Sequence, residues 1–273
     1  MQNRREFLGS LTLTGTAGIL GLGPRSVSAE PPPETTKIRL PAEPLPCTSP
    51  MFVAEELLRA EGFTEVQYVK IEGGRPGTER ALNSGVIDMR QAFAGSSVAN
   101  LDAGYSIVIL TGVHGGCYEL FGNDRVRTVR DLKGKSVAVA GLGSAFHLFA
   151  ASLLSYVGLD PNRDINWVTQ PPMEAMRLFA EGKVDAFMAV PPESQKLRAK
   201  EIGHAVVNSM MDRPWSQYYC CMVAGNREFV RKHPVATKRA LRALLTASDL
   251  CAREPERVAR FMADKATSTP CRR

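Results

Sequence analysis

The feature that most constrains the fold of this chain is a pattern of landmarks that occurs twice. The pattern Leu-Leu-x-x-x-Gly stands at residues 57–62 and again at residues 153–158, an offset of 96 residues (57 to 153). Further along, Gly-x-Ile-Asp at residues 85–88 is matched by Gly-x-Val-Asp at residues 182–185, an offset of 97 (85 to 182). Self-similarity of this kind indicates two copies of one structural module. Two similar lobes create a cleft, where small ligands commonly bind.

Short apolar runs alternate with amphipathic stretches through both copies, which is typical of α/β architecture. We expect strands at residues 37–40, 66–71, 86–89, 107–110, 136–140, 165–168 and 184–189. Several of these runs are apolar throughout, as in parallel strands that are buried on both faces. The predicted fold class is therefore α/β, with two similar lobes, each a doubly wound and mostly parallel sheet.

Two segments are candidates for crossings between the lobes. Residues 111–116 include three glycines and interrupt the alternation, which suits either a crossing or a plain surface loop. The apolar run at residues 218–223 could carry the chain back as a strand. Together they predict a hinge made of two crossings. The expected domain organisation is an export signal at 1–29, a disordered lead-in at 30–36, lobe 1 at 37–112 completed by 220–266, lobe 2 at 113–219 and an irregular tail at 267–273.

The first 29 residues have the pattern of a targeting segment. Arg4-Arg5 precedes a mildly apolar run at residues 11–23, and Val27-Ser28-Ala29 resembles a small-residue cleavage site. Paired arginines before such a run predict export by the twin-arginine route, and hence a periplasmic protein. The alternatives are an uncleaved anchor and a disordered basic tail. The run is shorter than the ~20 residues that a bilayer requires.

Charge and cysteine usage exclude several function classes. The chain has 34 Lys and Arg against 28 Asp and Glu, a net charge of +6. These charges are dispersed and not clustered with aromatic residues, so we expect no nucleic-acid partner. The six cysteines and four histidines show no CxxC and no ligand spacing, so we expect no metal site. Sequence cannot pair the cysteines into disulfides.

The candidate ligand site consists of loops in which small or hydroxyl residues follow a strand and open a helix. In open α/β sheets ligands bind at the carboxyl ends of strands, where helix N-termini offer unpaired N–H groups. The alternative role of each loop is ordinary helix capping. The predicted ligand-binding residues are Cys47, Thr48, Ser49, Gly95, Ser96, Ser97, Gly143, Ser144, Ala145, Pro191 and Glu193.

No catalytic residue and no cofactor are predicted. Gly141-Leu142-Gly143 lacks the third small residue of a dinucleotide loop, since Phe146 stands there. His147 follows Ser144 by three residues, but no acid that would orient it is evident, and Ser144 is outside a nucleophile elbow. We therefore expect a protein that is not an enzyme.

Several motifs resemble the periplasmic solute-binding proteins of ABC importers, of the nitrate/sulfonate/taurine and thiamine-pyrimidine-precursor binding type. The segment 131–139, Asp-Leu-Lys-Gly-Lys-Ser-Val-Ala-Val, resembles the family's entry to the second lobe. Residues 141–145 resemble its ligand loop, and residues 181–186 resemble its Gly-x-Val-Asp-Ala strand. The similarity extends over residues 38–266. The chain departs from the family after Lys265, where further helices are expected, so we expect a C-terminally shortened member.

The resemblance implies a periplasmic-binding-protein-like fold that closes around a small ligand. The implied ligand is anionic or heteroaromatic, such as an organosulfonate, nitrate or a pyrimidine precursor. The implied partners are that ligand and an ABC permease at the inner membrane, and we expect a monomer. Two alternatives stay open. One is an exported or relict enzyme of the same fold, similar to a pyrimidine synthase, which predicts a metal or cysteine-rich cluster and no leader. The other is a ligand sensor without transport.

Overall fold

The computed structural model describes residues 30–43 and 45–268, and the side chains of Arg75 and residues 265–268 are not described. The predicted export signal and the end of the predicted irregular tail lie outside the described residues. Chain contacts place residues from Pro32 onward in one compact unit. The following concerns that unit.

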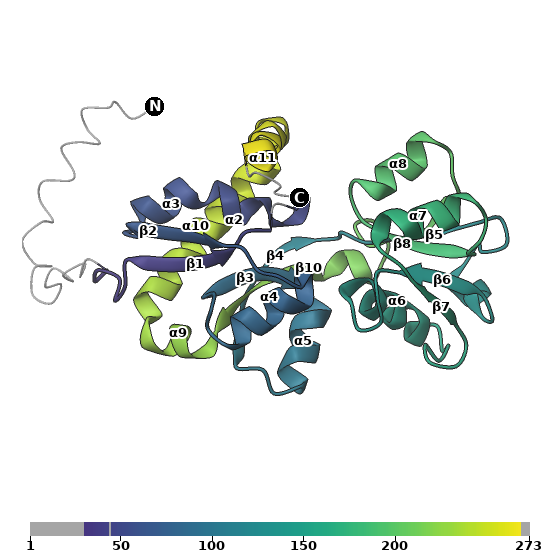
Figure 1. The fold of residues 1–273 in the computed structure, drawn as a ribbon, viewed down its shortest axis with the longest axis horizontal. Helices are drawn as coiled ribbons and strands as arrows, with labels where there is room; N and C mark the ends of the chain where they lie inside the picture. The colour runs from purple at the N-terminus through teal and green to yellow at the C-terminus, as the bar shows by residue number, and fades with distance from the viewer. Residues whose placement is uncertain (1–29, 44, 269–273) are drawn as a thin grey trace, which may run out of the picture. The chain divides into compact units, whose positions relative to one another are not determined.

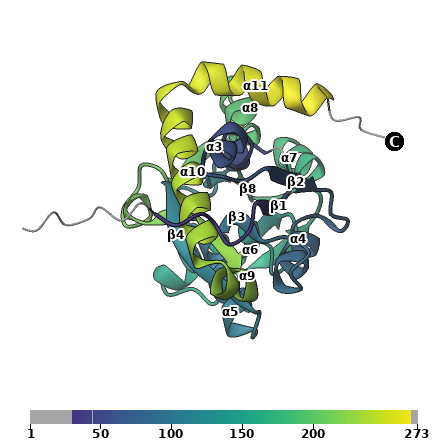
Figure 2. The same cartoon turned by 90° about the vertical axis from the view of Figure 1, so that its left-hand side faces the viewer.

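Lobe 1 is built from both ends of the unit (Figure 1). Its N-terminal elements are β1 (Lys37–Pro41), η1 (Pro46–Thr48), α2 (Ser49–Val53), α3 (Glu55–Ala60), β2 (Glu65–Val69), α4 (Gly74–Asn83), β3 (Met89–Phe93), α5 (Ala94–Asp102) and β4 (Ile107–Gly115). Its C-terminal elements are β10 (Tyr219–Asn226), α9 (Arg227–Lys232), α10 (Pro234–Arg253) and α11 (Pro255–Ser268). Helix α11 turns away from α10 at Glu254 (Figure 2).

Lobe 2 is a continuous stretch between the two crossings. Its elements are β5 (Glu119–Gly122), η2 (Val129–Leu132), β6 (Ser136–Val139), α6 (Ala145–Tyr156), β7 (Asn166–Thr169), α7 (Pro172–Ala180), β8 (Ala186–Ala189), α8 (Glu193–Ala199), β9 (His204–Asn208) and η3 (Trp215–Gln217). They form a five-stranded sheet of order β7-β6-β8-β5-β9. Strands β7, β6 and β8 are parallel, and β5 runs antiparallel to both of its neighbours.

The two sheets have the same plan. In lobe 1, β1 pairs with β2 in parallel, and β10 pairs antiparallel with β3 and β4. Strands β1 and β3 lie side by side, and the Asp88 amide donates to the Arg39 carbonyl at 2.8 Å. Lobe 1 thus has a two-stranded sheet, β2-β1, beside a three-stranded sheet, β3-β10-β4, and the strand order across both corresponds strand by strand to lobe 2. This confirms the predicted fold class of two similar, mostly parallel lobes.

Equivalent aspartates confirm the duplication at the level of hydrogen bonds. Asp88 Oδ2 accepts from the Arg39 amide at 2.7 Å, and Asp185 Oδ2 accepts from the Ser136 amide at 3.0 Å. Each aspartate amide in turn donates to the carbonyl of the same partner, Arg39 or Ser136. Both partners stand 49 positions before their aspartate. Each carboxylate thus joins two neighbouring strands, β1 and β3 in lobe 1 and β6 and β8 in lobe 2.

Equivalent glycines also occupy matching positions. Gly62 follows α3 with φ 102°, and Gly158 follows α6 with φ 83°. An L side chain rarely adopts such a conformation, so glycine ends the helix in both copies. The predicted equivalence of these two residues is confirmed.

The two crossings are the paired strands β4 and β10. Their register runs from Ile107 opposite Asn226 to Gly115 opposite Tyr219, with irregularities near Cys221. The predicted two-crossing hinge is therefore confirmed. Each lobe has its own core, that of lobe 1 around Ile38 and Phe63, and that of lobe 2 around Leu120 and Val137.

Several sequence-based expectations need correction. Strand β3 begins at Met89, three residues later than expected. The lead-in was expected to be disordered, but the Glu34 carboxylate accepts from the Val235 and Ala236 amides at 2.9 Å and caps α10. The expected irregular tail began at residue 267, but α11 continues to Ser268.

Among residues 30–43 and 45–268, none of the helices combines the length and the apolarity that crossing a membrane requires.

Candidate functional site

In lobe 1, the first predicted loop, at residues 47–49, forms η1 and the start of α2. Thr48 Oγ1 donates to the carbonyls of Glu43 and Leu45, and Ser49 Oγ donates to the Pro46 carbonyl at 2.8 Å. Both side chains are buried. The two hydroxyls therefore shape the turn, and α2 has only five residues, which makes its dipole small.

The second predicted loop, at residues 95–97, forms the first turn of α5. A Cβ at Gly95 would lie 2.6 Å from the Phe93 ring, so this close approach requires glycine. Ser96 is buried, and Ser97 Oγ donates to the Phe93 carbonyl at 3.3 Å.

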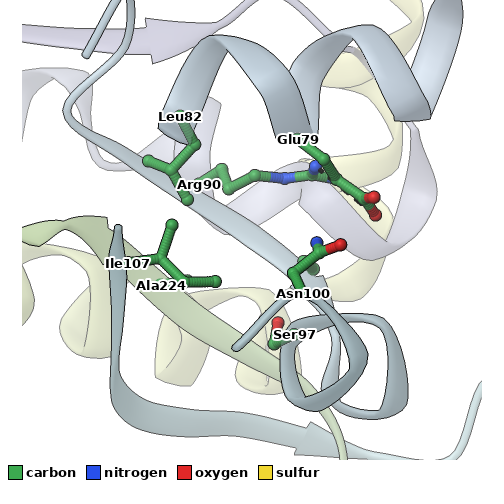
Figure 3. Close-up of a pocket in the computed structure, with 8 residues that line it drawn as sticks. Glu79, Leu82, Arg90, Ser97, Asn100, Ile107 and Ala224 are labelled. Carbon is green, nitrogen blue, oxygen red and sulfur yellow. Dashed lines mark ion pairs between the residues drawn. The ribbon is translucent and has the colours of Figure 1, made fainter. Parts of the chain in front are cut away.

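Ser97 also lines an internal cavity of about 10 Å³, enough for one water molecule. Figure 3 shows Ser97 and Asn100 of α5 facing the side chains of Arg90 and Glu79. Arg90 is 4% exposed, and its Nη1 lies 3.9 Å from Glu79 Oε1. The Ser97 hydroxyl thus lies within lobe 1, at a charged pair that the sequence analysis did not identify.

In lobe 2, the third predicted loop, at residues 143–145, caps α6. Ser144 Oγ accepts from the His147 amide at 3.3 Å and donates to the Gly141 carbonyl at 2.6 Å. The Gly143 amide points to His147 Nδ1 at 3.2 Å, and Gly143 has φ 74°. Burial lowers the pKa of His147. Since Nδ1 accepts a backbone hydrogen bond and Ser144 acts as an N-cap, this arrangement is that of a capped helix.

The fourth predicted loop, which contains Pro191 and Glu193, leads into α8. The peptide between Pro191 and Pro192 is cis, and Glu193 stands half-buried in the first turn. A carboxylate there interacts favourably with the N-terminal N–H groups. Helix α8 has only seven residues.

An aromatic cluster brings the second and third loops together. The Phe93 ring at the end of β3 packs edge-on against Tyr118 at 5.1 Å and Phe149 at 6.1 Å. Tyr118 in turn packs against Phe146 at 5.6 Å, in the first turn of α6. Helices α5 and α6 are in contact. Ala145 and Val190, which precedes Pro191, pack on the same core. Elements of both lobes therefore meet at this cluster.

A second cluster, of thiols and an imidazole, lies at the end of the paired strands β4 and β10 where the chain passes between the lobes. We call it the thiol cluster, and it consists of Cys47, His114, Cys117, Cys220 and Cys221. Cys117 Sγ lies 3.9 Å from Cys221 Sγ and 3.8 Å from His114 Nδ1. Our expectation that the chain has no metal site rested on local spacing, but these residues come from three segments that only the fold brings together.

The environment of the thiol cluster disfavours thiolates. Contact with Cys220 and with Cys47, together with burial, raises the pKa of Cys117 well above its ordinary value. The pKa of Cys220 is raised too, because contact with Cys221 and burial outweigh the opposing hydrogen bond from Cys117. Burial alone would lower the pKa of His114, but contacts with Cys117 and with the carbonyls of Gly115 and Cys47 raise it.

The sequence held only a partial signal for this cluster, because each of the two predicted crossings contains or adjoins cysteines. The register that places His114 opposite Cys221, and the position of Cys47 in η1, required the fold.

Known proteins resemble this chain in sequence and fold. A model of the NMT1-like family matches residues 31–264. The bicarbonate-binding protein CmpA of Synechococcus elongatus is 27% identical over 100 residues, which are 37% of this chain and 22% of that protein. The chain thus aligns with about a fifth of this curated relative.

Solved structures share the fold over most of the chain. The alkanesulfonate-binding protein SsuA from Xanthomonas axonopodis pv. citri, bound to MOPS, superposes with a TM-score of 0.68 at 22% identity, over 88% of this chain and 81% of that one. The periplasmic aliphatic sulphonate binding protein SsuA from Escherichia coli gives a TM-score of 0.70 at 20% identity, over 85% and 75%. The periplasmic nitrate-binding protein NrtA from Synechocystis PCC 6803 gives 0.68 at 17% identity, over 85% and 67%.

The family match spans both lobes and the two crossings, and the structural matches share the duplicated architecture derived above. The chain therefore belongs to the NMT1-like family and has a periplasmic-binding-protein fold.

Proposed function

We propose that this protein is the extracytoplasmic solute-binding component of an ABC importer. The observation that carries the proposal is the pair of lobes with matching strand order, linked through β4 and β10. Lobes that are linked in this way can open and close around a ligand by hinge motion. The relatives named above bind bicarbonate, sulfonates or nitrate.

The proposed partners are a small ligand and an ABC permease at the inner membrane. The proposed route to the periplasm is twin-arginine export, and the protein acts as a monomer and not as an enzyme.

The proposed ligand is an organic anion or a heteroaromatic compound, bound between α5 and α6. Both helices are long enough to present free N–H groups at their N-termini, whereas α2 and α8 are short. The hydroxyls of Thr48, Ser49, Ser97 and Ser144 bond within their own loops, so we assign ligand contact to the backbone N–H groups at the starts of α5 and α6.

Aromatic side chains at the return crossing would hold an apolar part of the ligand. Tyr218 and Tyr219 are 65% and 57% exposed, and Trp215 is partly buried nearby. Micromolar affinity requires about 8 kcal/mol, and one helix N-terminus supplies only ~1 kcal/mol. Apolar contact must supply most of the remainder, which favours organic acids over nitrate.

A thermal-shift screen tests this function. The panel comprises nitrate, bicarbonate, alkane- and arylsulfonates, pyrimidines and aromatic acids. A ligand that binds only the folded state raises Tm, by an amount that grows with its concentration. We expect at least one organic anion or heteroaromatic compound to do so, with one site per chain by calorimetry. No stabilisation by any member at millimolar concentration would count against the proposal.

Variants then locate the site. Ser144→Leu places a bulky side chain at the start of α6, and we expect it to weaken binding by at least tenfold. Ser155→Leu, at the exposed end of the same helix, is the matched control and should bind normally. Ser97→Ala should bind within about twofold of the parent, since that hydroxyl lines the internal cavity. Equal binding by the two leucine variants would place the site elsewhere.

One observation favours the enzyme alternative, namely the thiol cluster, because that alternative predicted a metal or cysteine-rich cluster. The same alternative predicted no leader, so the targeting pattern at residues 1–29 argues against it. Incubation of the best ligand with stoichiometric protein distinguishes a binding protein from an enzyme. Recovery of unchanged ligand by mass spectrometry supports a binding protein, whereas conversion of the ligand supports an enzyme.

A further inference from the structure

The thiol cluster has the composition of a site for a thiophilic metal ion. One ligand atom each from His114, Cys117 and Cys221 lies within 4.8 Å of the other two. The side chains of Cys47 and Cys220 interact with the same Cys117 thiol. Thiolate and imidazole ligands select ions such as Zn²⁺ over Ca²⁺ or Mg²⁺, which prefer oxygen.

Two separations within the cluster are close to the edges of a metal tetrahedron. With bonds of about 2.3 Å to sulfur and about 2.0 Å to nitrogen, tetrahedral zinc separates two sulfurs by roughly 3.8 Å and sulfur from nitrogen by roughly 3.5 Å. The observed separations are 3.9 Å between Cys117 and Cys221 sulfurs, and 3.8 Å between Cys117 Sγ and His114 Nδ1. The ligand atoms of His114 and Cys221 lie within 4.8 Å of each other, so an ion would draw these two closer together.

The ring nitrogen of His114 that lies beside the thiols is Nδ1, 3.8 Å from Cys117 Sγ. Nδ1 also lies 3.0 Å from the Gly115 carbonyl oxygen, and metal binding would replace that contact. Nε2 is buried without a hydrogen bond among the described residues, and the Cys47 backbone contacts the same ring, so Nε2 would carry the ring proton. A metal-bound histidine commonly has one ring nitrogen on the ion and the other on a backbone carbonyl.

A β-bulge explains how two adjacent cysteines reach the same place. Successive side chains of a regular strand point to opposite faces. In β10 the pairing passes from Tyr219 opposite Gly115 to Cys221 opposite His114, which leaves Cys220 as the extra residue. Both thiols consequently approach Cys117.

We propose that His114, Cys117 and Cys221, with Cys47 or Cys220 as the fourth ligand, bind one Zn²⁺ ion where the paired strands β4 and β10 lead from one lobe to the other. Binding releases the protons of the coordinating thiols to solvent. The ion connects both crossing strands, and it connects them to η1 of lobe 1 if Cys47 is the fourth ligand. This site is distinct from the proposed solute function and does not depend on it.

The test uses the full-length mature protein, reduced and purified without metal, and Zn²⁺ itself as the probe. We expect one Zn²⁺ per chain after dialysis, as measured by elemental analysis. Replacement by Co²⁺ should give the intense charge-transfer absorption of thiolate-bound, tetrahedral cobalt. Cys117→Ser and Cys221→Ser should each weaken zinc binding by at least about 100-fold in a competition assay with a chromogenic chelator.

Cys251→Ser is the matched control, because Cys251 lies on α10 and is not part of the thiol cluster; it should bind zinc as the parent does. Circular dichroism verifies that each variant is folded. If the two ligand variants fail to fold, the cobalt spectrum of the parent decides the outcome. Absence of zinc from the reduced parent, a cobalt spectrum without thiolate bands, or undiminished affinity in both folded ligand variants would each overturn the proposal. A disulfide within the cluster would do so if the reduced protein then fails to bind zinc.

Discussion

At the scale of single residues, the two aspartates that link the strands of each lobe carry unusual weight. Asp185 is 8% exposed, and its carboxylate accepts hydrogen bonds from Ser136, Asn123 and Arg125. Burial alone would raise the pKa of Asp185, but the Ser136 amide and hydroxyl, together with Asn123 and Arg125, lower it below its ordinary value of 3.8. The charged form is thus the one that the fold stabilises.

We expect Asp185→Asn to destabilise the protein by about 1–3 kcal/mol at pH 7, because it weakens charge-assisted hydrogen bonds to buried donors. A lowered pKa contributes stability that is present above the unfolded-state pKa and lost as the pH falls through the folded-state pKa. The deficit of the variant should therefore be constant between pH 5 and pH 7 and should shrink below pH 4 or so. Urea unfolding at a series of pH values measures it.

Asp124→Asn is the control for this experiment. Asp124 pairs with Arg127 at 3.0 Å, but its side chain is 94% exposed. Exposed pairs contribute ~0–1 kcal/mol. A deficit in Asp185→Asn as large at pH 3 as at pH 7 would contradict the assigned role of the carboxylate charge.

At the scale of elements, the sequence predicted the strands with a long apolar run and missed two strands without one. Strand β6 lies within one residue of its expected bounds, 136–140. Strands β5 and β9 are no shorter than β6, but their apolar runs are only Leu120-Phe121 and Ala205-Val206-Val207, and they pair with each other only through the fold. The expected strand at 86–89 was displaced because Val86 is 48% exposed in the turn that precedes β3.

Asn226 illustrates an element whose stability depends on one side chain. It caps α9, since its Oδ1 accepts from the Glu228 and Phe229 amides, both at 3.1 Å. Its Nδ2 donates to the Leu82 carbonyl at 2.9 Å and so ties the end of β10 to α4. The residue is 7% exposed, so removal of the side chain leaves buried backbone groups unpaired.

We expect Asn226→Ala to cost about 2 kcal/mol, from the lost cap and the unpaired carbonyl. Asn226→Asp keeps the acceptor but not the donor and should cost less. Chemical denaturation provides the measurement, and Asn162→Ala, in an exposed loop, should have no effect beyond about 0.5 kcal/mol. If Asn226→Ala and Asn162→Ala are equally stable, the cap does not hold α9.

At the scale of the whole molecule, the duplication was visible in the sequence, and the thiol cluster was not. Duplication repeats landmarks at a nearly constant offset, and the Gly62 and Gly158 pair preserves it. The thiol cluster needs the register of β4 against β10 and the position of Cys47 after β1, which are long-range facts. The predicted site loops open helices in both lobes, yet their hydroxyls bond locally, because capping satisfies nearby backbone groups before any ligand does.

The continuity of lobe 2 leads to the last prediction. All five strands of its sheet and helices α6, α7 and α8 lie between the crossings, and one of its cores, around Phe121 and Phe187, lies wholly within the same stretch. The other core also contacts Phe93, Cys220 and Cys221. A fragment of residues 118–218 should therefore fold alone, with lower stability than lobe 2 has in the full chain. We expect dispersed amide resonances and a cooperative thermal transition. A fragment of residues 118–203, which lacks β9 and so leaves β5 unpaired on one edge, should lose that cooperativity. A non-cooperative transition in the longer fragment would show that lobe 2 needs lobe 1 to fold.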